Sequence, residues 1–543
     1  MSVIDTRHEQ MFPVFDADQI ATARRFASGP PQTFAPDDAV YEVGELGSPV
    51  WLVIEGEIVV VRRDGLGHQQ PVTTHRAGQF SGEVSQLAGR GSLAAGHAGS
   101  GGCVALPFDA AHLRALIIGA AELGETIMRA LILRRVSLIE SDAAGSVLIG
   151  RPGEARLGRL QGFLTRNGYP HAVLDAAQTE GADFVARLGV QTDDLPLMVC
   201  PNGTVLKRPT EVEAALCLGI TPQLDADKTY DVAIVGAGPA GLAAAVYAAS
   251  EGLSVLMLDQ GAFGGQAGAS ARIENYLGFP TGISGQALAG RAYNQALKFG
   301  AEIALPLEVS KLSCDAPKAL SLQLTNGETV RSRAVVIASG ARYRRPPIDN
   351  LAMFEGAGVS YWASPIEARL CEGEEVALVG GGNSAGQAVV FLSPRVRKLH
   401  LIVRRDGLQA TMSKYLIDRI AALPNVELHT HTEVVALEGD AVTGLSAALF
   451  RDRRNGEIHS CDMRHLFLFI GADPNTGWLD GCVSLDAGGF VLTGRSGGPR
   501  ALETDRAGVF AIGDVRAGSV KRVAAAVGEG AAVVAQIHQF LAS

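Results

Sequence analysis

The sequence contains no C-x-x-C pair, although seven cysteines are spread along its 543 residues. Their scattered spacing predicts neither a disulfide framework nor a zinc site, so we expect reduced thiols and no bound metal. The sequence also has no excess of positive charge, because its formal net charge is −10. A nucleic-acid or anionic membrane surface is therefore not expected as the main partner, since both select clustered Lys and Arg.

An apolar leader is absent from residues 1–12, which include Asp5, Arg7 and Glu9. This segment is unlike a secretory signal, and we expect a cytoplasmic protein. One charge-free run, residues 232–249, is long enough to resemble a membrane helix in a hydropathy window. It contains a glycine-rich motif directly after a predicted strand, which favours a nucleotide-binding turn instead.

The composition, with 47% hydrophobic and 19% charged residues, is that of a folded protein, and the length predicts about three or four domains. Short apolar segments followed by a helical stretch predict a β-roll closed by a helix. Next comes the order strand, helix, strand, helix, strand, strand, helix, a thioredoxin-like arrangement. The remainder alternates strands, glycine-rich turns and helices, as in a doubly wound α/β protein. The predicted units are residues 1–142 (β-roll), 143–220 (thioredoxin-like), 221–229 (linker), 230–345 with 474–543 (first nucleotide-binding unit) and 346–473 (second nucleotide-binding unit).

The first glycine-rich motif follows the predicted strand at residues 230–235 and precedes a helical run. In such a motif the first glycine permits a tight turn, the second lets the backbone approach a pyrophosphate, and the third lets the helix pack on the strand. A second strand ends in Asp259, which is placed to accept hydrogen bonds from a ribose hydroxyl. These features predict a dinucleotide site formed by Gly236, Gly238, Pro239, Ala240, Gly241 and Asp259.

A second glycine-rich motif follows the strand at residues 375–379 and ends in a helix. The next strand ends in Arg404 and Arg405 rather than in an acid. Paired guanidinium groups can bind a 2′-phosphate, so the sequence favours NADPH over NADH. A solvated basic strand end is the alternative interpretation of this pair. The predicted NADPH-binding residues are Gly380, Gly382, Asn383, Ser384, Ala385, Arg404 and Arg405.

From about Tyr230 to the C-terminus the chain resembles the thioredoxin reductase family of pyridine-nucleotide flavoproteins. The resemblance rests on the segments at residues 264–266, 273–280, 336–341 and 508–514, in family order. It implies that the first site binds FAD and that the protein is a homodimer. Further FAD contacts implied by the resemblance are Gln260, Gly264, Gly265, Gln266, Asn275, Val309, Ala338, Ser339, Gly340, Gly513, Asp514, Lys521, Arg522 and Val523.

The predicted fold class is therefore α/β, with two Rossmann-like dinucleotide-binding domains of the three-layer ββα type after the β-roll and thioredoxin-like units. One position departs from the family: Gln409 stands where a further Arg is usual. Two dinucleotide sites in one chain predict hydride transfer from NADPH to FAD.

The redox dithiol of thioredoxin reductases is missing, because Trp362 and Pro365 stand at both cysteine positions. Neither residue can form a thiolate or a disulfide, so reduced flavin is expected to pass electrons directly to an acceptor or to use a group from another domain. The acceptor is open: disulfide proteins, ferredoxin-like carriers, quinones and oxygen all remain. A flavin- or nucleotide-binding redox sensor or interaction protein is the alternative, as is a thioredoxin-disulfide reductase with a thiol from elsewhere. No catalytic acid or base is identified.

The two N-terminal units resemble known domains that have lost their usual functional residues. The middle unit resembles a thioredoxin or glutaredoxin with Glu154 and Leu157 at the C-x-x-C positions. Its Leu195-Pro196 bond is predicted to be cis, and a docking or interdomain role is plausible by analogy with the alkyl hydroperoxide reductase flavoprotein. The first unit resembles a cyclic nucleotide-binding domain, but Ser92 stands where that family has its phosphate-binding Arg. Because Arg90 lies two residues early, a structural or interaction role is preferred over ligand sensing.

Overall fold

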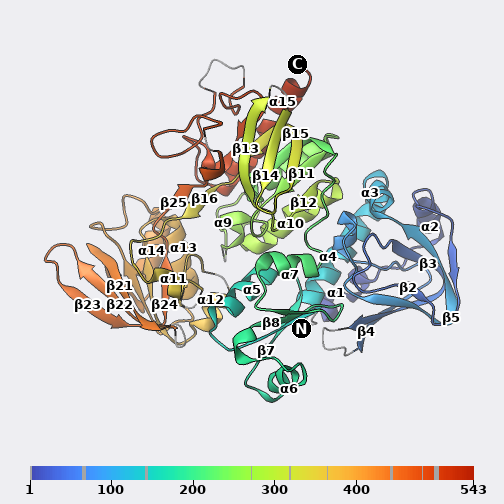
Figure 1. Cartoon of the computed structure of the whole chain (residues 1–543), viewed down its shortest axis with the longest axis horizontal. Coiled ribbons are helices and arrows are strands. Elements are labelled where there is room, and N and C mark those ends of the chain that lie inside the picture. Colours follow the sequence, from blue (N-terminus) through green and yellow to red (C-terminus); the bar gives the residue numbers. More distant parts are fainter. Residues whose placement is uncertain are drawn as a thin grey trace.

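The computed structural model describes residues 3–63, 69–140, 145–270, 272–316, 319–356, 358–363, 365–440, 444–479, 481–494 and 500–543. Figure 1 shows an N-terminal lobe, a small middle unit and two further lobes formed by the rest of the chain. The predicted boundary between residues 142 and 143 lies outside the described residues. Among the helices described, none combines the length and the apolar character that a membrane span requires.

The N-terminal unit is a five-stranded antiparallel β unit followed by two helices. The long strands β3 and β5 pair with each other, while β1 and β2 both pair with β5. Helix α3 begins where the Asp109 side chain accepts a hydrogen bond from the His112 backbone N–H (2.8 Å), which satisfies a free donor of the first turn. The elements are α1 (Val3–Met11), α2 (Ala17–Arg24), β1 (Gln32–Phe34), β2 (Ala39–Tyr41), β3 (Val50–Arg63), β4 (Gln69–Arg76), η1 (Val84–Ala88), β5 (Ala95–Phe108), α3 (Ala110–Gly119) and α4 (Ala121–Glu140).

The middle unit has a four-stranded sheet in the order β7-β6-β8-β9. Strands β6 and β7 are parallel, whereas β8 and β9 are antiparallel to their neighbours. The predicted cis bond between Leu195 and Pro196 is present. The elements are β6 (Ser146–Gly150), α5 (Ala155–Arg166), β7 (His171–Asp175), α6 (Thr179–Arg187), η2 (Thr192–Asp194), β8 (Leu197–Val199), β9 (Val205–Lys207) and α7 (Glu211–Cys217).

The third unit contains a seven-stranded sheet with the parallel order β12-β11-β10-β15 and the antiparallel strands β14 and β13 beyond β15. Strand β26 returns from near the C-terminus to pair with β15. The almost uninterrupted apolar run of β10 is typical of a parallel strand that is buried on both faces. The elements are β10 (Thr229–Val235), α8 (Pro239–Ser250), β11 (Val255–Leu258), α9 (Gly265–Gly268), α10 (Gly285–Lys298), β12 (Glu302–Ala304), β13 (Val309–Ala316), β14 (Ala319–Leu324), β15 (Thr329–Ile337), η3 (Gly477–Leu479), β26 (Val509–Ala511), η4 (Gly513–Val515) and α15 (Val523–Leu541).

The fourth unit has a five-stranded parallel sheet in the order β17-β24-β18-β19-β20 and a three-stranded antiparallel sheet. Two short paired strands, β16 and β25, carry the chain into and out of it. The elements are β16 (Ala341–Tyr343), α11 (Leu351–Phe354), β17 (Val359–Ser360), α12 (Pro365–Leu370), β18 (Glu375–Val379), α13 (Asn383–Leu392), β19 (Lys398–Ile402), α14 (Lys414–Ala421), β20 (Val426–His429), β21 (Thr432–Asp440), β22 (Gly444–Asp452), β23 (Ile458–Asp462), β24 (His465–Leu468) and β25 (Ala472–Pro474).

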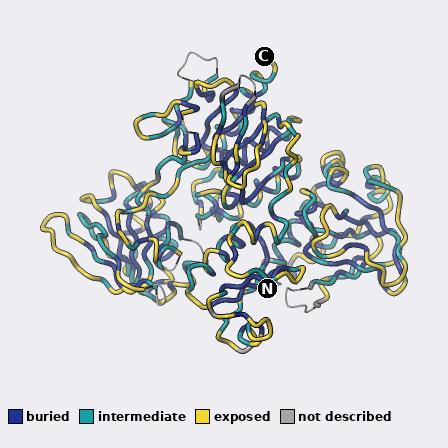
Figure 2. The backbone as a smooth tube through the Cα atoms, viewed as in Figure 1, coloured by how far each residue is buried: buried dark blue, intermediate teal, exposed yellow. Residues whose placement is uncertain are grey.

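The apolar cores of the units are partly continuous. One cluster of buried side chains extends from the N-terminal unit, through residues such as Leu116 and Leu131, into the third unit at Val232 and Tyr293. Figure 2 shows the buried strands at the centre of each lobe. Because apolar side chains are shared across this boundary, the N-terminal unit packs on the third unit and is not merely tethered to it.

The cysteine prediction was wrong for four of the seven residues. Cys200 pairs with Cys217 in the middle unit, and Cys314 pairs with Cys482 in the third unit. The partners lie 17 and 168 residues apart in the sequence but have Cα–Cα distances of 6.4 and 6.0 Å, within the usual range for a disulfide. Sheet topology brings them together, so sequence spacing carried no signal.

Candidate functional site

The first glycine motif forms a tight turn between β10 and α8. Gly236 has a φ of +114°, and a Cβ atom there would lie 2.2 Å from the Ala338 carbonyl oxygen. A Cβ on Gly241 would lie 1.9 Å from the Gly236 carbonyl oxygen, so the third glycine lets the helix pack on the turn. Gly238, by contrast, caps α8 and has open space around its Cβ position. This space faces a helix N-terminus, the arrangement that binds a pyrophosphate through backbone N–H groups.

Asp259 closes the same turn from the end of β11. Its carboxylate accepts hydrogen bonds from the backbone N–H groups of Ala237 and Gly261, both at 2.9 Å. Burial raises the pKa of this carboxyl, while the two N–H donors and the Arg166 guanidinium oppose the shift. A carboxylate has further lone pairs beyond those two bonds, so the predicted bond to a ribose hydroxyl is compatible with this geometry.

The C-terminal helix α15 brings its N-terminus to the other end of the same cradle. Gly513 approaches α8 closely, since a Cβ there would lie 2.9 Å from the Ala240 side chain. Asp514 follows on η4, and burial raises the pKa of its carboxyl. Lys521 donates to the Asp514 carbonyl oxygen, and α15 begins at Val523 with Arg522 as its N-cap. The structure therefore brings the predicted residues 513–514 and 521–523 together with the first glycine motif.

The other predicted FAD contacts lie around this cradle. Gly264 and Gly265 have positive φ values and open the short helix α9, and Gln266 Nε2 donates to the Ala341 carbonyl oxygen (2.5 Å). Ser339 Oγ donates to the Asn475 carbonyl oxygen (2.8 Å), which ties the end of β15 to the segment after β25. Ala338 and Val309 are buried, Gly340 is half-buried, and Gln260 and Asn275 are exposed.

The second glycine motif repeats this geometry in the fourth unit. Gly380 has a φ of +151°, and a Cβ there would lie 2.5 Å from the Phe469 carbonyl oxygen. Gly382 caps α13 and has open space around it. The Asn383 side chain accepts from the Ser413 backbone N–H (2.7 Å), which fixes the start of α13; Ser384 and the buried Ala385 follow on the helix.

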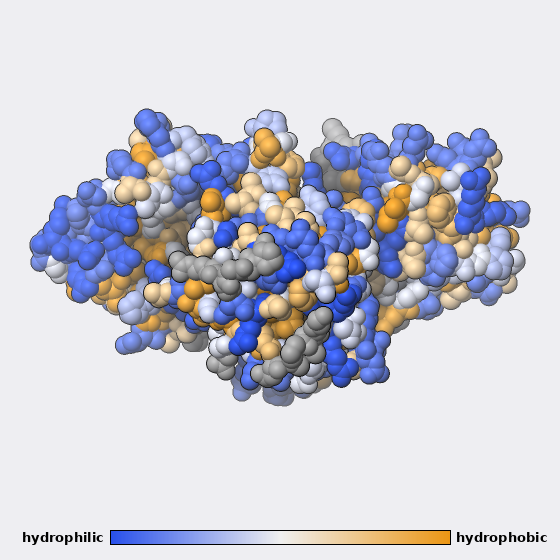
Figure 3. Space-filling view, turned by 90° about the horizontal axis from the view of Figure 1, so that it is seen from above, coloured by the Kyte–Doolittle hydropathy of each residue, from blue (hydrophilic) through white to orange (hydrophobic). Residues whose placement is uncertain are grey.

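Arg404 and Arg405 are both exposed just after the end of β19. Because β18 and β19 are parallel, the two arginines lie at the same edge of the sheet as the Gly380 turn, which follows β18. A third cation reaches this place: Arg453, from the turn between β22 and β23, donates to the Arg404 carbonyl oxygen (3.5 Å). Figure 3 shows that the outer end of this lobe is covered by hydrophilic side chains. Sequence reasoning missed Arg453 because it lies 49 residues beyond Arg404, in a different sheet.

Trp362, which replaces the first family cysteine, is half-buried beside α12. Its indole N–H donates to the Glu367 carboxylate (2.9 Å), and its ring lies 6.5 Å from the Tyr343 ring. The Arg166 guanidinium, from the middle unit, lies 5.6 Å from the centre of the Trp362 ring. Pro365 opens α12 at the second cysteine position.

The middle unit touches both nucleotide-binding units at the C-terminal end of α5. The Arg166 carbonyl oxygen accepts from Gln286 Nε2 (2.9 Å), and Asn167 Nδ2 donates to the Gly261 carbonyl oxygen (3.4 Å). Arg166 therefore lies near both sites: its guanidinium contacts the Trp362 ring, and its charge opposes the rise that burial causes in the pKa of the Asp259 carboxyl. Sequence reasoning did not identify Arg166, because only the packing of three units gives it this position.

The N-terminal unit contains a separate cavity of about 160 Å³. Its lining includes Ser92 and the buried Arg134, whose guanidinium donates to the Gly82 carbonyl oxygen (2.9 Å). Arg90 is used elsewhere: its Nη2 donates to the Ile303 carbonyl oxygen of the third unit (3.1 Å). Arg90 is thus an interdomain contact.

A model of the family described as pyridine nucleotide-disulphide oxidoreductase matches residues 230–530. The thioredoxin reductase of Mycolicibacterium smegmatis is 34% identical over 320 residues, which cover 58% of this chain and 97% of that protein. The NADPH-dependent thioredoxin reductase 3 of Arabidopsis thaliana is 34% identical over 58% of each chain. An alkyl hydroperoxide reductase component of Escherichia coli (strain K12) is 31% identical over 59% of this chain and 61% of that protein. This chain thus spans about three fifths of the plant and E. coli relatives.

Two solved structures agree with these similarities. The T. acidophilum thioredoxin reductase has a TM-score of 0.53 and 29% identity, covering 58% of this chain and all of that one. The Lactococcus lactis thioredoxin reductase in its FR conformation has a TM-score of 0.53 and 26% identity, covering 58% and 99%. The Rossmann-like fold prediction is confirmed for this part of the chain, and thioredoxin reductase homologues use FAD and NADPH, the predicted cofactor pair.

Proposed function

Since the chain belongs to the pyridine nucleotide-disulphide oxidoreductase family, we propose that it is an FAD-dependent NADPH oxidoreductase that reduces its acceptor directly from the flavin. The carrying observation is a pair of glycine cradles, each at a helix N-terminus, in a chain whose family dithiol positions hold Trp362 and Pro365. When bound, FAD supplies the two-electron chemistry. The acceptor is proposed to be a small molecule or a redox protein.

In this proposal the residues of the chain bind, orient and shield the cofactors. The N–H groups at the starts of α8 and α13 hold the two pyrophosphates, and Asp259 holds the flavin-side ribose. Arg404 and Arg405 bind the 2′-phosphate, with Arg453 beside them. Trp362, with Arg166 of the middle unit 5.6 Å from the centre of its ring, occupies the first family cysteine position. This supports a direct transfer from flavin to acceptor in place of a dithiol relay.

One observation favours a second candidate, a thioredoxin-disulfide reductase that uses a different thiol pair. The Cys200–Cys217 disulfide lies in the middle unit, the same unit that contacts both nucleotide-binding units through Arg166. A disulfide that accepted electrons from the flavin would restore a relay by another route. Cys200 itself is fully buried, which disfavours direct exchange with a partner thiol.

An anaerobic titration of the FAD-loaded protein with NADPH separates these candidates. For direct transfer we expect the flavin absorbance to bleach with one NADPH per FAD, and to recover when a competent acceptor is added. A requirement for two NADPH per FAD, reduced to one in Cys217→Ser, would instead assign a redox role to the Cys200–Cys217 pair. Failure of both NADPH and NADH to bleach the flavin would refute the enzyme proposal and favour a redox sensor, the remaining alternative.

The N-terminal unit is proposed to have a structural or interaction role. Its apolar core continues into the third unit, and Arg90, which lies two residues before the missing phosphate-binding position, is engaged in that contact. The homodimer implied by the family resemblance is part of the same proposal. Sedimentation of the full chain with and without FAD tests the assembly.

A further inference from the structure

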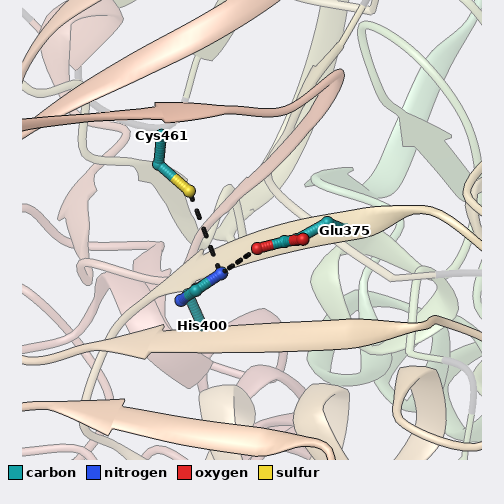
Figure 4. A group of neighbouring side chains, drawn as sticks. All are labelled: Glu375, His400 and Cys461. Carbon is teal, nitrogen blue, oxygen red and sulfur yellow. Dashed lines mark hydrogen bonds and ion pairs between the residues drawn. The ribbon is translucent and has the colours of Figure 1, made fainter.

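A group of metal-ligating side chains lies between the two sheets of the fourth unit, away from the glycine motif. Glu375 comes from the start of β18, His400 from the middle of β19, and Cys461 from β23 of the antiparallel sheet. Their donor atoms all lie within 4.8 Å of one another. Figure 4 shows the three side chains pointing toward one another, with dashed lines from one nitrogen of the His400 ring to the Glu375 carboxylate and to the Cys461 sulfur.

One nitrogen of His400 lies close to both of the other donor atoms. His400 Nε2 lies 2.7 Å from Glu375 Oε1 and 3.9 Å from Cys461 Sγ. In a tetrahedral zinc site, metal–ligand bonds of about 2.0–2.3 Å place neighbouring donors roughly 3.4–3.8 Å apart. The His–Cys distance is already close to this value. The His–Glu distance would have to widen by somewhat under 1 Å, which a rotation of the partly exposed Glu375 side chain can provide.

We propose that Glu375, His400 and Cys461 bind one zinc ion, with a water molecule at the fourth position. A thiolate, an imidazole and a carboxylate together form a ligand set that suits zinc, whereas calcium and magnesium prefer oxygen ligands alone. The site has no role in the proposed hydride transfer. The bound ion would join β23 of the antiparallel sheet to β18 and β19 of the parallel sheet, and so crosslink the two sheets of the NADPH-binding unit.

The surrounding side chains orient two of the three ligands. The other ring nitrogen of His400, Nδ1, lies 2.9 Å from His429 Nε2, so the Nδ1–H group can donate a hydrogen bond to His429 and leave Nε2 free for the metal. Arg397 donates to Glu375 Oε2 (3.1 Å), which leaves the opposite oxygen, Oε1, directed at His400. Metal-binding histidines and carboxylates typically have such outer partners.

Two further charged groups, Glu427 and Lys398, lie near the site and contribute to its net charge. Glu427 Oε2 lies 3.9 Å from His400 Nδ1, and Lys398 donates to the same Glu427 oxygen (2.7 Å). The two carboxylates, Glu375 and Glu427, and the two cations, Arg397 and Lys398, offset one another, so the Cys461 thiolate would balance one of the two positive charges of the ion. Sequence spacing could not reveal this site, because His400 lies 25 residues from Glu375 and 61 residues from Cys461.

The first test uses the full FAD-loaded chain after treatment with a chelator. We expect one cobalt(II) ion to bind per chain with absorption bands of a tetrahedral thiolate site, measured beyond the flavin bands, and zinc to displace it. After zinc is added back and the excess is removed, elemental analysis should find one zinc per chain in the wild type and none in Cys461→Ser or Glu375→Gln. Cys371→Ser, which removes a buried free thiol elsewhere in the same unit, is the matched control and should bind as the wild type does.

The second test keeps the proposal falsifiable if those variants fail to fold. In the wild-type protein, zinc should slow alkylation of Cys461 at least tenfold, as followed by peptide mapping, while alkylation of Cys371 keeps its rate. His429→Ala should weaken zinc binding about 10- to 100-fold by removing the partner of the ligand. Absence of cobalt and zinc binding, or equal binding by wild type and Cys461→Ser, would overturn the proposal; neither result depends on NADPH oxidation.

Discussion

Replacing Arg404 and Arg405 by alanine should change the choice between NADPH and NADH more than it changes catalysis. Both side chains are exposed, and the end of β19 that carries them is held by two backbone bonds, from Gly380 N–H to the Ile402 oxygen (2.9 Å) and from Val403 N–H to the His429 oxygen (2.9 Å). The substitutions therefore remove charge without disturbing the strand.

The expected loss in kcat/KM for NADPH follows from the hydrogen bonds that the 2′-phosphate would lose. A hydrogen bond to a charged group contributes about 1.5–3 kcal/mol, and solvent exposure places these at the low end. We expect each single variant to lower kcat/KM for NADPH about tenfold, and the double variant about 50- to 100-fold. The value for NADH, which has no 2′-phosphate, should change less than twofold. Raising the ionic strength should shrink the difference between wild type and variants.

The assay is anaerobic flavin reduction by each nucleotide, followed by absorbance. Arg451→Ala is the matched control, because Arg451 is exposed on β22 and pairs with Glu433 (2.5 Å). It should leave both rates unchanged. If the double variant lost activity with NADPH and NADH equally, the arginines would not read the phosphate, and the interpretation of a solvated basic strand end would hold.

Three other perturbations have defined outcomes. Gly241→Ala should destabilise the FAD-free chain by about 1–3 kcal/mol in thermal unfolding. Gly238→Ala should leave the melting temperature of the FAD-free chain unchanged yet abolish FAD retention on gel filtration. Equal melting temperatures for Gly241→Ala and the wild type would contradict the first expectation. Burial, and then the Arg134 charge, hold the pKa of His75 well below its ordinary value of 6.5. Because the unfolded chain then binds a proton more readily than the folded one, the free energy of unfolding should fall as the pH drops below 6.5. A wild-type pH profile of stability that matches the profile of His75→Gln would count against this expectation. In the Cys314→Ser variant, which lacks the Cys314–Cys482 disulfide, reducing the Cys200–Cys217 disulfide should cost about 3 kcal/mol in denaturant unfolding. The double variant Cys217→Ser/Cys314→Ser should be insensitive to reductant, and a reductant-sensitive double variant would disprove this assignment.

The nucleotide cradles are the part of this protein that the sequence determines by itself. Gly236, Gly241 and Gly380 sit where a Cβ atom would collide with nearby backbone. Because this demand arises within a strand, a turn and a helix that are contiguous in the chain, it leaves a local pattern of residues. The replacement of the family dithiol by Trp362 and Pro365 can likewise be identified from the sequence.

Only the tertiary structure decided the contacts between distant segments. The two disulfides, the position of Arg166 over Trp362, and the approach of Glu375, His400 and Cys461 all join residues that share no spacing motif. They depend on which strands neighbour one another and on how the units pack. Side-chain chemistry in a sequence states what a residue can bind, but the order of strands in a sheet decides which other residues it meets.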